Sequence, residues 1–109
     1  MEKEKLDLLV YVNRSCYRVK VLKTIGTGIK IPKQISQDSG LIINHVSNIL
    51  KELLLKDLVY CINPEFRKGR MYKLTDKAWE IMDYVEYTPR YSTLYKKYGE
   101  EEESSSVDS

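Results

Sequence analysis

The strongest pattern of apolar and polar positions lies in residues 42–56, where it predicts an amphipathic helix. The apolar stripe of this helix consists of Val46, Ile49, Leu50 and Leu53. The polar residues that lie away from the stripe are Asn44, His45, Asn48, Lys51 and Glu52. A helix with this pattern buries the stripe and leaves its polar face accessible.

Two helices are predicted near the start of the chain. Residues 4–12 form a short apolar helix or arm, because Leu6, Leu9 and Val10 have helical spacing. Ser15 is a favourable N-cap for a second helix, which ends near Gly26. The apolar positions expected to face inward on this second helix are Tyr17, Val21, Leu22 and Ile25.

A further short helix is predicted directly before residues 42–56. Pro32 suits the first position of a helix, and Gly40 suits the position just after its end. Residues 29–31 alternate in polarity and are long enough for a strand of three residues at most. The chain therefore contains a short helix, a glycine turn and a longer amphipathic helix, which together form a helix-turn-helix.

The segment after residue 56 predicts a hairpin. Residues 58–62 and 71–75 are rich in strand-forming residues, and the loop between them ends in a basic cluster. Thr75 or Asp76 then caps a helix over residues 77–87, and a last helix is expected over residues 89–98. The residues expected to face inward on the helix over 77–87 are Ala78, Ile81, Met82 and Val85.

This order of elements predicts an α+β fold, mostly α, with one two-stranded hairpin and helices at both ends. A chain of 109 residues is long enough for one domain with a modest core. We divide it into an N-terminal arm or helix, a central domain, a C-terminal helix and an acidic tail. Their bounds are residues 1–14, 15–87, 88–99 and 100–109.

Charge separates the tail from the rest of the chain. Residues 100–109 hold five acidic and no basic side chains, whereas residues 1–99 hold 18 basic and 11 acidic ones. The tail is too polar to offset its chain entropy, so we expect it to be disordered. A basic body attracts polyanions, although lysine-rich surfaces also arise for solubility. The tail could compete with nucleic acid for the basic face.

Candidate chemistry is sparse. Cys16 and Cys61 stand far from each other and from the single histidine, which favours two reduced thiols over a disulfide or a metal pair. We find no phosphate loop, nucleophile set or metal-ligand spacing, so we expect neither an enzyme nor a metal or other cofactor. No signal peptide or membrane-spanning segment is visible, and we expect a cytoplasmic protein without membrane contact.

Two motifs carry a family resemblance. The first is Leu-x-x-Lys-Asp-Leu-Val over residues 53–59, and the second is Gly-Arg-x-Tyr-x-Leu-Thr over residues 69–75. With residues 18–25 and 34–41, they resemble winged helix-turn-helix transcriptional regulators of the ArsR and MarR type, especially small archaeal ones. The resemblance covers residues 15–87. It implies a winged helix whose second motif helix, residues 42–56, recognises double-stranded DNA.

The residue types agree with DNA recognition. Short amides, a hydroxyl and a lysine on a helix can reach base edges in the major groove. The candidates are Asn44, His45, Ser47, Asn48 and Lys51, of which Asn44, Asn48 and Lys51 are the leading ones. Any amphipathic helix also has a polar face, so for each residue alone a role in solvation is as reasonable. A catalytic or metal-binding role for His45 is the least favoured reading.

Two more groups complete the predicted DNA surface. Regulators of this type touch the minor groove or its phosphates with the wing, which here carries Arg67, Lys68 and Arg70. The alternative for these three is a solvated loop. Near the start of the first motif helix, Lys33, Gln34 and Ser36 could bind backbone phosphate.

The sequence departs from the family pattern at two helix caps and at the cysteines that the metal-sensing ArsR branch carries on its recognition helix. Ile31 and Ile42 stand where family members usually have serine or threonine, and neither can cap a helix with its side chain. Cap-hydroxyl contacts to phosphate are therefore not carried over. Residues 42–56 contain no cysteine, which disfavours a metal-released repressor.

The C-terminal stretch is rich in tyrosine at steps of three or four residues, which suits an interface helix. Related regulators dimerise through terminal helices, so the resemblance implies a homodimer and a roughly palindromic site. The candidate interface residues are Leu6, Leu9, Tyr84, Tyr87, Tyr91, Tyr95 and Tyr98. The alternative is a monomer whose last helix packs on its own core.

Together these features predict a sequence-specific DNA-binding transcriptional regulator. The serious rival is a winged-helix module that binds another protein, because one fold serves many functions. RNA binding is a third possibility that composition leaves open. The basic loop and the mildly basic helix favour DNA.

Overall fold

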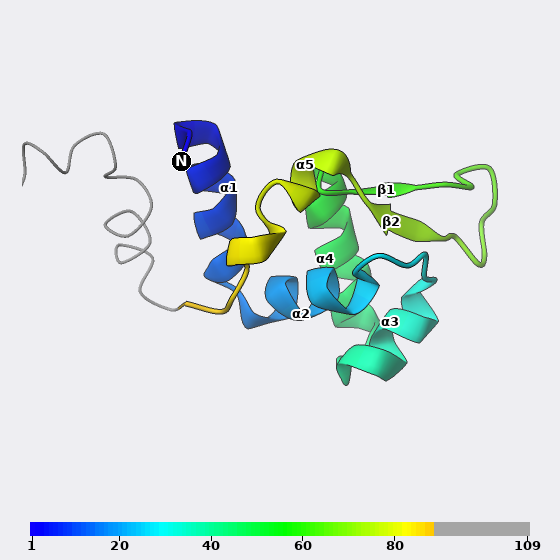
Figure 1. The fold of residues 1–109 in the computed structure, drawn as a ribbon. Helices are drawn as coiled ribbons and strands as arrows, with labels where there is room; N and C mark the ends of the chain where they lie inside the picture. The colour runs from blue at the N-terminus through cyan, green and yellow to red at the C-terminus, as the bar shows by residue number, and fades with distance from the viewer. Residues whose placement is uncertain (89–109) are drawn as a thin grey trace, which may run out of the picture.

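The computed structural model describes residues 1–88. Within them, five α-helices and a two-stranded antiparallel sheet form an α+β fold that is mostly helical, as predicted (Figure 1). The helices are α1 (Lys3–Asn13), α2 (Cys16–Ile25), α3 (Pro32–Ser39), α4 (Ile43–Leu55) and α5 (Asp76–Trp79). The strands are β1 (Val59–Cys61) and β2 (Tyr72–Leu74), and a 3-10 turn, η1, spans Met82–Tyr84.

Helix α4 supplies the centre of the core. The four residues of its predicted apolar stripe are all buried, which confirms both the helix and its inward face. Helix α2 packs against α1, α3 and α4, and β1 packs against α4. This packing from several sides gives α4 a fixed position, because burial of the stripe provides the main stabilisation of such a helix.

Helix α2 begins as predicted and differs in one inward residue. The Ser15 hydroxyl accepts a hydrogen bond from the Arg18 backbone N–H at 3.3 Å, so Ser15 is the N-cap. Val19 is buried, whereas Tyr17, which was expected to face inward, is exposed. The Tyr17 ring instead lies on the surface, against the ring of His45 in α4.

The turn between α3 and α4 follows from Gly40. This glycine has φ +79°, a left-handed conformation that glycine adopts without steric cost. The Ser36 hydroxyl donates to the Leu41 carbonyl at 2.5 Å, and the Ser39 hydroxyl accepts from the Leu41 N–H at 3.2 Å. These contacts define where α4 begins relative to α3.

The hairpin pairs Val59 with Leu74 and Cys61 with Tyr72. A third segment adds one bridge, in which Lys30 and Tyr72 exchange backbone hydrogen bonds of 3.1 and 2.8 Å. The expected strand over residues 29–31 is thus limited to Lys30. Its extension is short because Pro32 has no N–H to donate and already begins α3.

The prediction of one helix over residues 77–87 is wrong. Helix α5 ends at Trp79, η1 follows, and Val85 is extended. Asn13, buried at the end of α1, explains the difference: its Nδ2 donates to the Tyr84 carbonyl and its Oδ1 accepts from the Glu86 N–H. The Asn13 carbonyl also accepts from the Thr88 N–H at 2.7 Å. These bonds replace those of a continuing helix.

The burial predicted for that segment is nevertheless correct. Ala78, Ile81 and Val85 are buried, and Met82 packs against the core. Thr75 is the N-cap of α5, because its hydroxyl accepts from the Ala78 N–H at 3.1 Å. The same side chains therefore point inward from a backbone conformation that differs from the predicted one.

The predicted helix over residues 89–98 and the acidic tail lie outside the described residues. Within residues 1–88, no helix combines the length and the apolar character that crossing a membrane requires. Cys16 and Cys61 are both half-buried free thiols.

Candidate nucleic-acid interface

The polar row of α4 comprises Asn44, Asn48 and Lys51. All three side chains are exposed, and their positions on the helix lie opposite the buried stripe. Asn44 and Asn48 are four residues apart and therefore neighbours on one face. The structure thus brings the three leading candidates together on the accessible side of a helix whose other side is held in the core.

His45 and Ser47 occupy the flanks of this row. The His45 ring packs on the Tyr17 ring of α2, with ring centroids 4.8 Å apart and planes tilted by 33°. Both His45 and Ser47 are half-buried. His45 is therefore turned toward α2 and stands at the edge of the polar row.

A polar cluster fixes the C-terminal half of α4 to α1 and α2. Glu52 accepts hydrogen bonds from Arg18 Nε at 3.0 Å and from the Tyr11 hydroxyl at 3.1 Å. Arg18 also donates to the Tyr11 carbonyl at 2.8 Å, and its guanidinium carbon lies 3.8 Å from the centre of the Tyr11 ring. Burial raises the pKa of Tyr11 above its ordinary value of 10.0; the Arg18 charge opposes this shift and the Glu52 carboxylate adds to it. Sequence periodicity did not reveal this cluster, because its members are far apart in the chain.

The three candidates on α3 are used differently. Lys33 is exposed. Gln34 Oε1 accepts from the Ile31 backbone N–H at 3.0 Å, so Gln34 supplies the cap contact that the isoleucine cannot make. Ser36 is committed to the Leu41 carbonyl. Of the three, Lys33 is the one free of a structural task in the turn.

The hairpin loop, residues 62–71, is organised by Asn63. This side chain is buried, and its Oδ1 accepts from the Met71 N–H at 2.7 Å and from the Cys61 thiol at 3.4 Å. Its Nδ2 donates to the Gly69 carbonyl at 3.1 Å. Gly69 has φ +70°, which closes the loop tip. The loop therefore has a defined shape despite its exposure.

The exposed Arg70 side chain folds back onto this loop and bonds its backbone. Its Nε donates to the Phe66 carbonyl at 2.6 Å, and its Nη2 donates to the Pro64 carbonyl at 3.3 Å. Arg67 and Lys68 are exposed near the tip of the loop, as Arg70 is, but no such bond to the loop backbone is seen for them in the described residues. The structure thus divides the three predicted loop cations into one that shapes the loop and two that it presents.

The charges of the described chain are unevenly placed. The segment that forms α2, α3, α4 and the hairpin, residues 14–73, has 12 basic and four acidic side chains. The flanking residues 1–13 and 74–88 have three basic and seven acidic ones. In space, α1 and η1 lie at one side and the hairpin and α3 at the other, with α5 between them at the base of the hairpin (Figure 1). A Lys5–Glu80 ion pair of 3.7 Å joins α1 to the end of α5.

The comparisons leave the family open. No protein-family model matches the chain, and no curated protein or solved structure shows a significant similarity to it.

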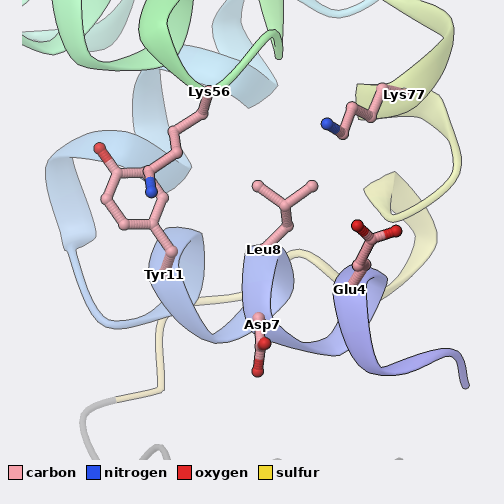
Figure 2. Close-up of a pocket in the computed structure, with 6 residues that line it drawn as sticks. All are labelled: Glu4, Asp7, Leu8, Tyr11, Lys56 and Lys77. Carbon is pink, nitrogen blue, oxygen red and sulfur yellow. The ribbon is translucent and has the colours of Figure 1, made fainter.

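A pocket of about 220 Å³ lies between α1 and the ends of α4 and α5, outside the polar row (Figure 2). Its lining residues are Glu4, Asp7, Leu8, Tyr11, Lys56 and Lys77. The Lys56 ammonium lies 4.9 Å from the centre of the Tyr11 ring. Two lysines balance two carboxylates in the lining, so the pocket does not extend the basic surface.

The predicted dimer residues are only partly available. Leu6 and Leu9 are buried within the chain itself, Leu9 in the main core, so they are not presented to a partner. Tyr84 and Tyr87 are exposed, but they lie on η1 and the extended segment that Asn13 holds, not on one helical stripe. Tyr91, Tyr95 and Tyr98 lie outside the described residues.

Proposed function

We propose that this protein is a winged-helix, sequence-specific DNA-binding transcriptional regulator. The helix pair α3–α4 serves as the helix-turn-helix, and the hairpin serves as the wing. The single observation that carries the proposal is the exposed polar row of α4 on a helix held rigidly in the core. Such a helix can enter the major groove without rearrangement.

The two surfaces have different tasks in this proposal. Asparagine makes paired hydrogen bonds with adenine, and lysine meets guanine or phosphate, so the polar row reads bases. Arg67 and Lys68 contact phosphates or the minor groove beside the site, where cations add affinity without sequence information. Lys33 adds a backbone contact from α3.

The uneven charge supports this orientation. The excess of basic residues belongs to the elements that would face DNA, whereas the acidic excess belongs to the flanking segments. A polyanion is attracted to the first and repelled by the second. The proposal is a binding protein without a catalytic step or cofactor, working in the reducing cytoplasm that its two free thiols suit.

We further propose a homodimer that binds a roughly palindromic site with half-sites about 34 Å apart. Because Leu6 and Leu9 are buried, the interface must use other residues, and Tyr84 and Tyr87 are the exposed members of the predicted set. Sedimentation equilibrium at micromolar concentration tests this: a dimer mass supports it, and only a 12.8 kDa species contradicts it.

One observation favours a protein-binding module as the second candidate. Leu55, at the last position of α4, is 86% exposed, and Trp79 at the end of α5 is also exposed. Large exposed apolar side chains are enriched where proteins meet. This reading predicts no affinity for DNA.

The deciding experiment titrates the full chain onto a labelled duplex from its own upstream region and onto a scrambled duplex, at several salt concentrations. We expect preference for the first duplex and affinity that falls steeply with salt. Absence of binding to both at low salt contradicts the proposal and favours the protein-binding module.

A matched pair of variants separates local contact from overall charge. Arg67→Gln with Lys68→Gln removes two charges from the hairpin loop, and Lys3→Gln with Lys77→Gln removes two from the acidic side. We expect the first pair to weaken binding and flatten its salt dependence, and the second pair to leave both nearly unchanged. Equal effects of the two pairs would contradict a contact by the loop.

A further inference from the structure

Two isoleucines at the start of α4 have no structural explanation in the core. Ile42 is 59% exposed and Ile43 is 44% exposed. Ile42 is also the N-cap, with an extended backbone and no side-chain cap hydrogen bond. Isoleucine is among the poorest residues at this position, where serine, threonine or asparagine satisfies a free N–H. Neither capping nor burial therefore accounts for these side chains.

Both stand at the N-terminal end of α4. Ile43 lies one turn before Ser47, on the flank of the polar row, and Ile42 directly precedes the helix as its N-cap. The N-terminal residues of a recognition helix are the ones that contact base edges. The apolar pair therefore stands where α4, in the proposed function, comes closest to the bases.

The exposed residues in the first half of α4 share one chemical preference. Asparagine pairs with N6 and N7 of adenine, and apolar side chains contact the 5-methyl group of thymine. Arginine, the commonest reader of guanine, is absent from the sequence of α4. Lys51 is the one cation of the polar row, and it lies two turns beyond Ile43.

We propose that α4 recognises an A·T-rich half-site, with Asn44 and Asn48 on adenines and Ile42 and Ile43 on thymine methyl groups. This inference rests on the proposed function, because it names the bases that the same helix reads. In this proposal, both exposed isoleucines contact thymine methyl groups in the major groove, which offsets the poor capping by Ile42.

The test removes the methyl groups and leaves the protein unchanged. A duplex selected from a random pool by the full chain is compared with the same duplex carrying uracil in place of thymine. Base pairing and phosphate charge stay the same. We expect an A·T-rich selected sequence and a loss of about fourfold in affinity for each methyl group contacted.

Variants then assign the effect to the isoleucines. The double variant Ile42→Ser with Ile43→Ser should bind the thymine and uracil duplexes about equally, and each single variant should show a smaller difference than the unaltered protein. Leu55→Ser is the control, because Leu55 is more exposed and lies on the same helix about three turns away. It should keep the difference between the two duplexes. Ile42→Ser should also raise the melting temperature, since serine caps the helix, so its loss of binding is not explained by unfolding.

The outcomes separate the inference from the function beneath it. Binding that prefers a G·C-rich sequence, or that ignores the change from thymine to uracil, overturns the inference and leaves the proposed function standing. Failure to bind any duplex at low salt overturns both.

Discussion

Helix α4 and the hairpin loop are both proposed to touch DNA, and they obtain their shape in opposite ways. Helix α4 is ordered by apolar burial on one side, so its polar row has no structural task. The loop is ordered by polar contacts of Asn63 and Arg70 with its own backbone. In the proposed function, the residues of α4 that contact DNA are therefore distinct from those that fold it, whereas the loop uses neighbouring polar residues for both.

The largest expected effect comes from the same substitution made in each region. Asn63→Ala removes a buried amide with three hydrogen bonds and should lower the free energy of unfolding by about 2–3 kcal/mol. Asn44→Ala removes an exposed amide and should change it by less than about 0.5 kcal/mol. Urea denaturation measures both. Equal destabilisation would remove the contrast between the regions.

The exposed asparagines of α4 should matter for DNA binding, although they contribute little to stability. Asn44→Ala or Asn48→Ala should each weaken binding to the preferred duplex by about 1–3 kcal/mol, because paired hydrogen bonds to a base are lost. Binding to a scrambled duplex should hardly change. Fluorescence anisotropy on both duplexes measures this, and an equal loss on the two would argue that the polar row touches only phosphates.

The loop arginines provide a sharper contrast at constant charge. Arg70→Lys keeps the charge but loses the fork that reaches the Phe66 and Pro64 carbonyls, so stability should fall by about 1 kcal/mol. Arg67→Lys should have almost no effect on stability, since Arg67 is exposed. Thermal unfolding of the two variants gives the comparison. Identical melting curves would show that Arg70 does not brace the loop.

The smallest expected effect is a pH dependence of stability that arises in the polar cluster of Tyr11, Arg18 and Glu52. The pKa of Tyr11 is raised in the fold, so the unfolded chain loses this proton first as pH rises above 10.0. The stabilisation is full below that pH and is lost as pH rises through the folded pKa. Tyr11→Phe should flatten this fall in stability. Denaturation series at pH 8 to about 11 for both proteins check it, and parallel curves would contradict it.

Much of the helical part of this fold follows from local pattern. The stripe of α4, the Ser15 cap and the turn at Gly40 depend on neighbours in the chain, so the sequence predicts them. The helix over residues 77–87 fails because Asn13, some 70 residues away, captures the backbone of Tyr84 and Glu86. Periodicity predicts which side chains are buried there and does not predict which backbone carries them.

The candidate site shows the same limit. Exposure of Asn44, Asn48 and Lys51 follows from helical spacing alone. The pairing of His45 with Tyr17 and the brace formed by Arg70 depend on contacts between separate segments or on loop geometry. A basic loop sequence gives no sign of which cation hydrogen-bonds to the loop backbone. The exposure of the three leading candidates could thus be predicted from the sequence, whereas the contacts made by the other candidates could not.

The most direct test of the central claim is the ratio of affinities for preferred and scrambled duplexes at one salt concentration. It is measured for the unaltered protein, for Asn44→Ala with Asn48→Ala, and for Arg67→Gln with Lys68→Gln. We expect the ratio to fall toward one in the helix variant and to be kept in the loop variant, whose affinity for both duplexes drops. A ratio that falls equally in both variants, or in the loop variant alone, would contradict it.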